Sequence, residues 1–250
     1  MLLEGKTIIV TGASSGIGAA AARAFSAEGA RLVLGARRSD LLAAITSEIV
    51  ADGGEAVFVA GDVEDIGYAE QLVQRAEASF GGLDGAFNNA GIIGNLGPIP
   101  EMDQSNWHKV IAVNLDSGFY AAKYQIPAVR KRGGGSIVFT SSFVGHTIGL
   151  PGMGAYAAAK AGLIGMTQVL AAEHGSENIR VNALLPGGTK TPMAGEDANV
   201  HETVRGFHAL KRMAEPSEIA RAALFLLSDH ASFVTGSAMI ADGGNSINKP

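Results

Sequence analysis

Short apolar runs alternate with longer, alanine-rich stretches along almost the whole chain. The runs are rich in β-branched residues and apolar nearly throughout, which is typical of strands buried on both faces. Seven are predicted, at Thr7–Thr11, Leu32–Ala36, Ala56–Ala60, Gly85–Asn88, Ser136–Ser141, Arg180–Leu185 and Ala238–Ala241. The intervening stretches predict helices at Gly16–Gly29, Asp40–Asp52, Asp65–Phe80, Asn106–Arg132, Gly154–Gly175 and Pro216–Ser228.

This order of elements predicts an α/β protein. Right-handed crossovers between parallel strands would place helices on both faces of one doubly wound, seven-stranded sheet. No repeat, low-complexity tract or linker interrupts the pattern, so we expect a single domain over residues 1–250. The segment from Gly187 to about Ala214 lacks clear periodicity, and irregular segments beside a strand end often form lids. We predict a substrate lid over about 188–214, with an ordinary surface excursion as the alternative.

Composition narrows the function classes. With 47% hydrophobic residues the chain can bury a sizeable core. Its 19 Lys and Arg against 24 Asp and Glu give a net charge of −5, which argues against nucleic-acid or anionic-membrane partners. The absence of cysteine excludes disulfides, thiolate metal sites and a cysteine nucleophile. It suits a reducing cytoplasm, and we expect a cytoplasmic protein because neither a signal peptide nor a membrane span is evident.

Glycine is unusually frequent, at 34 residues, and it gathers at the ends of the apolar runs. The first run continues as Thr11-Gly12-Ala13-Ser14-Ser15-Gly16-Ile17-Gly18 into an alanine-rich helix. Such a turn forms a phosphate site, because backbone N–H groups and the positive end of the helix dipole face the anion. Its spacing differs from the G-x-G-x-x-G dinucleotide fingerprint, and it lacks the G-K-[ST] ending of an ATP-binding P-loop.

The second strand ends at Ala36-Arg37-Arg38. In dinucleotide folds an acidic residue at this strand end holds the adenosine ribose, whereas an arginine accommodates a 2′-phosphate. Loss of the acid and gain of two guanidinium groups favour NADP(H) over NAD(H). A solvated pair of surface arginines is the alternative.

Tyr156 and Lys160 lie four residues apart in a predicted helix, so they share one face. A nearby cation favours the ionised phenol, and we expect Lys160 to lower the pKa of Tyr156 toward the range useful for acid–base chemistry. A tyrosine and a lysine at this spacing also occur by chance in many helices.

Further motifs accompany this pair, and together they indicate a known family. They are TGASSGIG at 11–18, Asp62-Val63, NNAG at 88–91, Asn114 in VNL, Ser142 in SIVFTSS, YAAAK at 156–160, IRVNALLPG at 179–187 and TGSAMIADGG near the C-terminus. In this order and spacing, the chain resembles the single-domain short-chain dehydrogenases/reductases over essentially its whole length. The resemblance implies a Rossmann-like fold and a nicotinamide cofactor.

The resemblance also implies four catalytic roles. Tyr156 would be the general acid in reduction and the general base in oxidation, and Lys160 would lower its pKa and bind the nicotinamide ribose. Ser142 would orient the substrate oxygen, and Asn114 would hold a water in a proton relay. Ser142 lies 14 residues before Tyr156, one more than is usual in the family, so Ser141 is a competitor, although the Phe-Val-Gly after Ser142 favours Ser142.

An extended cofactor site is implied in the same way. Its members would cradle the pyrophosphate, hold the 2′-phosphate, contact the adenine and line the nicotinamide. They are Gly12, Ser14, Ser15, Gly16, Ile17, Gly18, Arg37, Arg38, Asp62, Val63, Asn89, Ala90, Gly91, Tyr156, Lys160, Pro186, Gly187, Gly188, Thr189 and Thr191. Thr189 departs from the family, where isoleucine or valine is frequent, which weakens that one nicotinamide contact.

The candidate substrate residues are mostly apolar: Ile93, Asn95, Leu96, Phe143, His146, Met153, Met193 and Phe207. They favour a small, neutral, fairly hydrophobic ketone or alcohol. The 6 histidines lack the spacing of a metal site, and no metal is expected. His201 and His208 lie in the predicted lid, where we expect a surface or pocket-rim position.

We therefore predict an NADP(H)-dependent oxidoreductase that interconverts a ketone and a secondary alcohol by hydride transfer. Three alternatives stay open: a 3-oxoacyl-(acyl-carrier-protein) reductase that docks through Arg130-Lys131-Arg132, an NAD-dependent dehydrogenase, and a dinucleotide sensor without turnover. The last strand resembles one that builds subunit contacts in the family, so we also predict a homotetramer.

Overall fold

Every predicted strand is present, within one residue of its expected bounds. The computed structural model describes residues 1–248 and contains β1 Thr7–Thr11, β2 Arg31–Ala36, β3 Glu55–Ala60, β4 Gly85–Asn88, β5 Gly135–Thr140, β6 Ile179–Pro186 and β7 Ala238–Ala241. The helices are α1 Gly16–Ala27, α2 Ser39–Ala51, α3 Ile66–Phe80, α4 Gln104–Ile111, α5 Ser117–Lys131, α6 Gly154–His174, α7 Ala198–Phe207 and α8 Pro216–Leu227.

The strands form one parallel sheet in the order β3-β2-β1-β4-β5-β6-β7. The chain winds outward from β1 through β2 to β3, and then returns to β4 on the other side of β1. The order therefore reverses between β1 and β4, and in open α/β sheets ligands bind at the carboxyl ends of the strands beside such a switch. The fold is the predicted Rossmann-like, doubly wound single domain.

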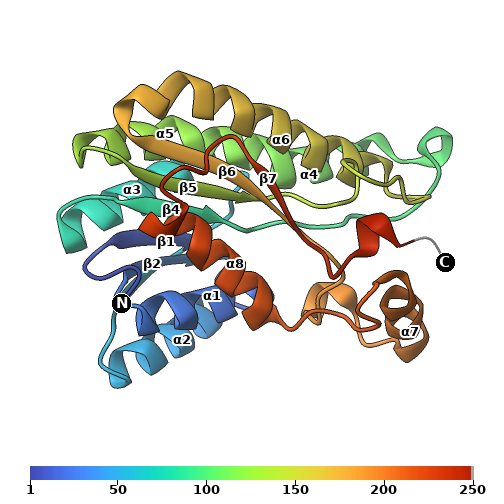
Figure 1. Ribbon diagram of the computed structural model, residues 1–250, viewed down its shortest axis with the longest axis horizontal. Coiled ribbons are helices and arrows are strands. Elements are labelled where there is room, and N and C mark those ends of the chain that lie inside the picture. The colour runs from blue at the N-terminus through green and yellow to red at the C-terminus, as the bar shows by residue number, and fades with distance from the viewer. Residues whose placement is uncertain (249–250) are drawn as a thin grey trace.

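Both faces of the sheet are covered, because successive residues of a strand point to opposite sides. Ile8 and Val10 of β1 pack with Phe25 of α1 in a core that includes α2 and α8. Ile9 faces a second core, built with α3, α5 and α6. Figure 1 shows the two helical layers, with α1, α2 and α8 on one side of the sheet and α4, α5 and α6 on the other. Phe25 and Phe87 meet edge to face, with ring centroids 6.0 Å apart.

The single helix predicted over Asn106–Arg132 is wrong in detail. The helical run begins at Gln104 and is divided into α4 and α5 by a π-helical turn over Ala112–Asp116. A π-turn inserts one extra residue into a helix and is frequent at functional sites. Here it carries Asn114, whose buried side chain points to the loop after β4.

The segment predicted as irregular contains α7. The Asp197 carboxylate caps this helix by accepting a hydrogen bond from the Asn199 N–H at 2.8 Å. The helix escaped prediction because it has only ten residues, none of them buried, although Val200, Val204 and Phe207 are spaced to share one face. In Figure 1, α7 stands apart from the two helical layers. No helix within residues 1–248 is both long enough and apolar enough to cross a lipid bilayer.

Candidate active site

The glycine turn between β1 and α1 leaves an open cradle at the helix N-terminus. Gly12 and Gly16 have φ values of 68° and 54°, a region that favours glycine. A Cβ on Gly18 would lie 2.3 Å from the Gly12 carbonyl oxygen, so the turn needs glycine there. The Ser15 hydroxyl does not cap α1, which leaves this helix end available to an anion. A cradle that a Cβ would fill fits the pyrophosphate of a dinucleotide.

Arg37 and Arg38, which follow β2, differ in their position relative to the glycine turn. Arg38 donates from Nη2 to the hydroxyl oxygens of Ser14 and Ser15, at 2.9 and 2.8 Å, and so places its charge beside the glycine turn. The side chain of Arg37 is 66% exposed, and its Nη1 lies 3.9 Å from a carboxylate oxygen of Asp62. Arg38 therefore adds positive charge directly to the cradle, whereas Arg37 stands at its edge.

Thr11 ties the loop after β4 to the glycine turn. Its Oγ1 accepts hydrogen bonds from the backbone N–H groups of Asn89 and Ala90, at 3.0 and 3.2 Å. The next residue, Gly91, has no room for a side chain, because a Cβ there would lie 2.8 Å from Asn114 Oδ1. Thr11 was not among the predicted site residues; its place at the carboxyl end of the first strand was the available signal.

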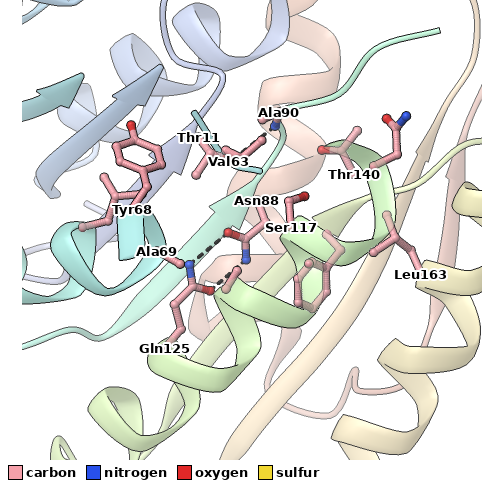
Figure 2. A pocket seen from close by; sticks show the side chains of 15 residues that line it. Thr11, Val63, Tyr68, Ala69, Asn88, Ala90, Ser117, Gln125, Thr140 and Leu163 are labelled. Carbon is pink, nitrogen blue, oxygen red and sulfur yellow. Dashed lines mark hydrogen bonds between the residues drawn. The ribbon is translucent and has the colours of Figure 1, made fainter. Parts of the chain in front are cut away.

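A cavity of about 20 Å³ lies behind these loops, between the sheet and α5 (Figure 2). Val63 and Asn114 contribute to its lining, and its volume is about that of one water molecule. Asn88 and Gln125 face each other across two amide hydrogen bonds of 2.8 and 2.9 Å, as Figure 2 shows. The sequence did not predict this partly buried polar pair.

Tyr156 and Lys160 lie in the first turns of α6, one turn apart as predicted. Lys160 is only 3% exposed, and its Nζ donates to the Thr140 carbonyl oxygen at 2.7 Å. The same Nζ lies 5.7 Å from the centroid of the half-buried Tyr156 ring. Thr140 is the last residue of β5, so the sheet itself holds the lysine in place.

The pKa of Tyr156 is shifted upward overall, opposite to the direction expected from the nearby Lys160 alone. Burial raises the pKa of Tyr156 above its usual value, and a hydrogen bond with Ser142 only partly offsets this shift. Burial also lowers the pKa of Lys160 to about 7. Both shifts have one cause: the site is dry, and a dry site disfavours the charged form of each group. Tyr156 therefore keeps its proton at neutral pH.

Ser141 and Ser142 have different roles. The Ser141 hydroxyl donates to the Lys160 carbonyl oxygen at 2.6 Å inside the protein. The Ser142 hydroxyl, in contrast, hydrogen-bonds Tyr156 and accepts from the Val144 N–H at 3.1 Å. The geometry therefore favours Ser142, despite the longer spacing to Tyr156.

Asn114 is held by the loop that it supports. Its Nδ2 donates to the carbonyl oxygens of Ile92 and Val110, at 2.8 and 2.9 Å, and its Oδ1 accepts from the Ile92 N–H at 3.1 Å. The amide thereby fixes the loop after β4 against the π-turn, close to Lys160 and Gly91.

Known proteins resemble this chain over almost its whole length. A family model described as Enoyl-(Acyl carrier protein) reductase matches residues 12–246. The chain is 42% identical over 247 residues to 2,5-dichloro-2,5-cyclohexadiene-1,4-diol dehydrogenase of Sphingobium indicum, covering 97% of each chain. The chain belongs to the short-chain dehydrogenase/reductase family.

Two further relatives widen the comparison. Cyclohexanol dehydrogenase of an Acinetobacter species is 39% identical over 238 residues, which cover 95% of this chain and 94% of that one. The crystal structure of a short-chain type dehydrogenase/reductase from Mycobacterium marinum superposes with a TM-score of 0.94 at 32% identity, over 98% of this chain and 97% of that one. These similarities identify this short-chain dehydrogenase/reductase as a carbonyl/alcohol oxidoreductase that acts on CH–OH groups with a nicotinamide dinucleotide.

The turn after β6 closes the predicted cofactor site. Thr189 and Ala214 form a parallel β-bridge, so the two ends of the lid segment are joined at its base. Thr191 contacts the glycine turn: a Cβ on Gly16 would lie 3.0 Å from its Cγ2. Pro186 is buried, while Gly187 packs directly against the Asp242 backbone.

The predicted substrate residues lie on the loops after β4, β5 and β6, at the carboxyl edge of the sheet, and they differ in burial. Phe143 is buried; Ile93 and Met153 are half-buried; Asn95, Leu96, His146, Met193 and Phe207 are exposed. The Gly97 N–H donates to the Gly152 carbonyl oxygen at 3.1 Å, which joins the loops after β4 and β5. The residues predicted to contact substrate thus lie mainly at the exposed rim of the candidate site.

Two further sequence-based interpretations are narrowed. His208 is not on the surface, because its side chain is buried, and it lies instead at the wall of a cavity. The three cations of Arg130–Arg132, considered as a docking patch for acyl carrier protein, each pair with an acidic side chain: Glu177, Glu77 and Asp84, respectively. Paired cations offer an acidic partner less free charge, which weighs against this docking patch.

Proposed function

We propose that this short-chain dehydrogenase/reductase is an NADP(H)-dependent enzyme that interconverts a ketone and a secondary alcohol, with Tyr156 as its acid and base. The observation that carries the proposal is the buried set of groups around one phenol: Ser142 hydrogen-bonds Tyr156, and Lys160 lies over its ring.

The residues of the chain would divide the work as follows. Bound at the cradle, a nicotinamide dinucleotide supplies or accepts the hydride. In reduction, negative charge grows on the substrate oxygen, and the hydroxyl groups of Ser142 and Tyr156 donate hydrogen bonds to it. Tyr156 gives that oxygen its proton, which it retains at neutral pH because burial raises its pKa. In oxidation the same hydroxyl receives the proton.

Lys160 and Asn114 would resupply that proton. Lys160 has a pKa of about 7, so it exchanges a proton readily near neutral pH. Asn114 lies beside it, in the wide π-turn. A water held by Asn114 would link Lys160 to the interior cavity of Figure 2, which has room for one.

NADP(H) is proposed over NAD(H) because of Arg38. Its guanidinium is held by Ser14 and Ser15 beside the cradle, where a 2′-phosphate would gain charge-assisted hydrogen bonds. Arg37 lies near Asp62, at the edge where the adenine is expected, and would reach the same phosphate from the other side.

We propose a neutral alicyclic ketone or alcohol as the substrate class. Two relatives named above are dehydrogenases of six-membered cyclic alcohols. The exposed rim residues Leu96, Met193 and Phe207 are apolar, and the last two lie on the segment of about 188–214, including α7, that would serve as a lid. Such a surface suits a ring without charge better than it suits an acid or a sugar.

A homotetramer is proposed for the assembly. Phe233 is fully exposed in the connection between α8 and β7, and Phe225 of α8 and Ile240 of β7 are also exposed large apolar residues. A second copy would bury them. Light scattering would contradict this if the mass were that of one chain, 25.5 kDa.

The deciding experiment is oxidation of NADPH and of NADH, followed by absorbance, against cyclic ketones, diketones, ketoacyl thioesters and sugars. We expect turnover with NADPH and cyclic ketones, and much weaker turnover with NADH. Equal rates with both cofactors would overturn the assignment of NADP(H). Measurable NADPH binding without turnover on any substrate would favour a dinucleotide sensor.

A further inference from the structure

His208 is a buried histidine that the proposed reaction does not use. It follows the last residue of α7 and is 1% exposed. Its Nε2 lies 3.0 Å from the backbone nitrogen of Gly188, and its Nδ1 lies 2.7 Å from the carbonyl oxygen of Val204. A backbone N–H can only donate and a carbonyl can only accept. The two contacts therefore require a neutral imidazole that carries its proton on Nδ1.

The end of α7 fits against Gly188 without spare room. A Cβ on Gly188 would lie 2.3 Å from Val204 Cγ1 and 2.9 Å from His208 Cε1, so only glycine allows this approach. The base of the lid segment is closed separately, by the bridge between Thr189 and Ala214. Between His208 and the turn after β6 there is thus one direct side-chain hydrogen bond, to Gly188.

The turn after β7 packs on another side of the imidazole. A Cβ on Gly243 would lie 3.2 Å from His208 Cδ2, and the Gly243 carbonyl accepts from the Leu210 N–H at 3.1 Å. A cavity of about 150 Å³ adjoins the ring, with Arg212 and Asp242 in its lining. Loss of the bond to Gly188 would let the ring turn into this space, so the expected consequence is a looser lid rather than a collapsed core.

We infer that His208 is a positioning residue that couples the lid helix to the turn at Pro186–Thr191. Holding Gly188 fixes the backbone of that turn, and holding Val204 fixes the end of α7. Closure of the lid over the substrate and placement of the nicotinamide side of the site would then occur together. The inference rests on the proposed function, in which this turn lines the nicotinamide.

Two amide variants of different reach test the coupling. In His208→Gln, the side-chain amide oxygen can occupy the place of Nε2 and accept from Gly188. In His208→Asn, the amide reaches only as far as Nδ1, so Val204 keeps a partner and Gly188 loses one. In the Asn variant the buried N–H of Gly188 has no acceptor. We therefore expect the KM for ketone to rise about tenfold in this variant, with a smaller change in kcat. The Gln variant should stay close to wild type.

Hydrogen exchange of the free protein provides a readout independent of catalysis. We expect faster exchange over 198–207 and at Gly188 in the Asn variant, with wild-type rates in the Gln variant. Thr203→Ala is the matched control, because this exposed residue of α7 bonds only within its own helix, to the Asn199 carbonyl. It should change neither exchange nor KM.

The possible results distinguish a failure of this inference from a failure of the proposed function. Equal KM values and equal exchange in the Asn and Gln variants would overturn the inference, as would a looser α7 without any change in KM. If the Asn variant does not fold, His208→Leu replaces it, because leucine fills the site and offers no acceptor. If Tyr156→Phe retains full turnover, the proposed function fails, while the exchange result still decides whether His208 holds the lid.

Discussion

The two sides of the active site are built in opposite ways. On the catalytic side, Lys160 and Asn114 are buried, and each is hydrogen-bonded to backbone carbonyl groups of the sheet or its loops. On the substrate side, Met193 and Phe207 are 50% and 36% exposed on the lid segment. The proposed catalytic groups are thus held by the scaffold, whereas the proposed substrate contacts are side chains that can change without affecting the fold.

This difference has an energetic origin. A buried polar group must keep its partners, because an unpaired one costs about 1–3 kcal/mol. Lys160 and Asn114 accordingly donate to backbone carbonyl groups of other segments. Exposed rim residues carry no such requirement, and their substitution usually changes stability by less than about 0.5 kcal/mol. Substitutions on the two sides should accordingly differ in size and kind.

Tyr156→Phe should produce the largest effect. It removes the proton donor and keeps the ring, so we expect turnover to fall by about 10²–10⁴-fold while NADPH binding persists. Steady-state kinetics and cofactor fluorescence measure the two properties. Tyr120→Phe, on α5, is the control and should retain activity. Undiminished turnover in the Tyr156 variant would remove this residue from the reaction.

Lys160→Met should reveal the cost of burying an amine. The pKa of Lys160 is about 7 in the folded protein and 10.5 ordinarily, so between these values the unfolded chain holds a proton that the folded protein has released. The free energy of unfolding of the wild type therefore rises as the pH increases from about 7 to 10.5. Below pH 7 it carries the full cost of burying a charged lysine. The variant lacks this dependence.

The measurement is the free energy of unfolding in denaturant for both proteins. The advantage of the Met variant should be greatest near neutral and lower pH, and should shrink by about 1.4 kcal/mol per pH unit as the pH rises. Parallel curves for the two proteins would mean that Lys160 titrates at its ordinary value when folded.

Arg38→Ser sharpens the comparison at the cofactor side. Removing the guanidinium held by Ser14 and Ser15 should raise the KM for NADPH about tenfold, because charge-assisted bonds to phosphate are lost. The KM for NADH should barely change. Arg37→Ser, at the neighbour that lies near Asp62, should show a smaller shift. Identical changes for both cofactors would place Arg38 away from the 2′-phosphate.

Phe207→Ala should have the smallest effect on the protein and a selective one on substrates. The ring is partly exposed at the end of α7, so we expect unfolding free energy to change by less than about 1 kcal/mol. The ratio of kcat/KM between a bulky and a small cyclic ketone should change severalfold. A uniform loss across all ketones would instead assign Phe207 to the catalytic side.

The sequence was most informative where local pattern and global fold agree. The positions of all seven strands were predicted from the buried apolar runs. The glycine turn was predicted from its glycines, which a tight backbone turn requires. Helix α7 did not follow, because its side chains are mostly exposed and its start depends on a cap by Asp197. The π-turn at Asn114 did not follow either, since an added residue in a helical run leaves no periodic signal.

At the site, the residue types could be predicted but not their surroundings. The pair of Tyr156 and Lys160 was evident from its spacing, yet the direction of the pKa shift of Tyr156 was not. That direction depends on burial, and burial depends on loops distant in the sequence. The choice between Ser141 and Ser142 likewise needed the position of the Lys160 carbonyl, which takes the Ser141 hydroxyl.

By itself, the sequence determined the doubly wound sheet, the glycine turn and the set of proposed reactive groups, because these depend on periodicity and on short, ordered motifs. Only the tertiary structure decided which groups are dry, which arginine faces the cradle and how the lid is held. Those properties arise where segments far apart in the chain meet, as Gly188 meets His208 and Lys160 meets Thr140. The exclusion of solvent from such contacts cannot be predicted from the local sequence.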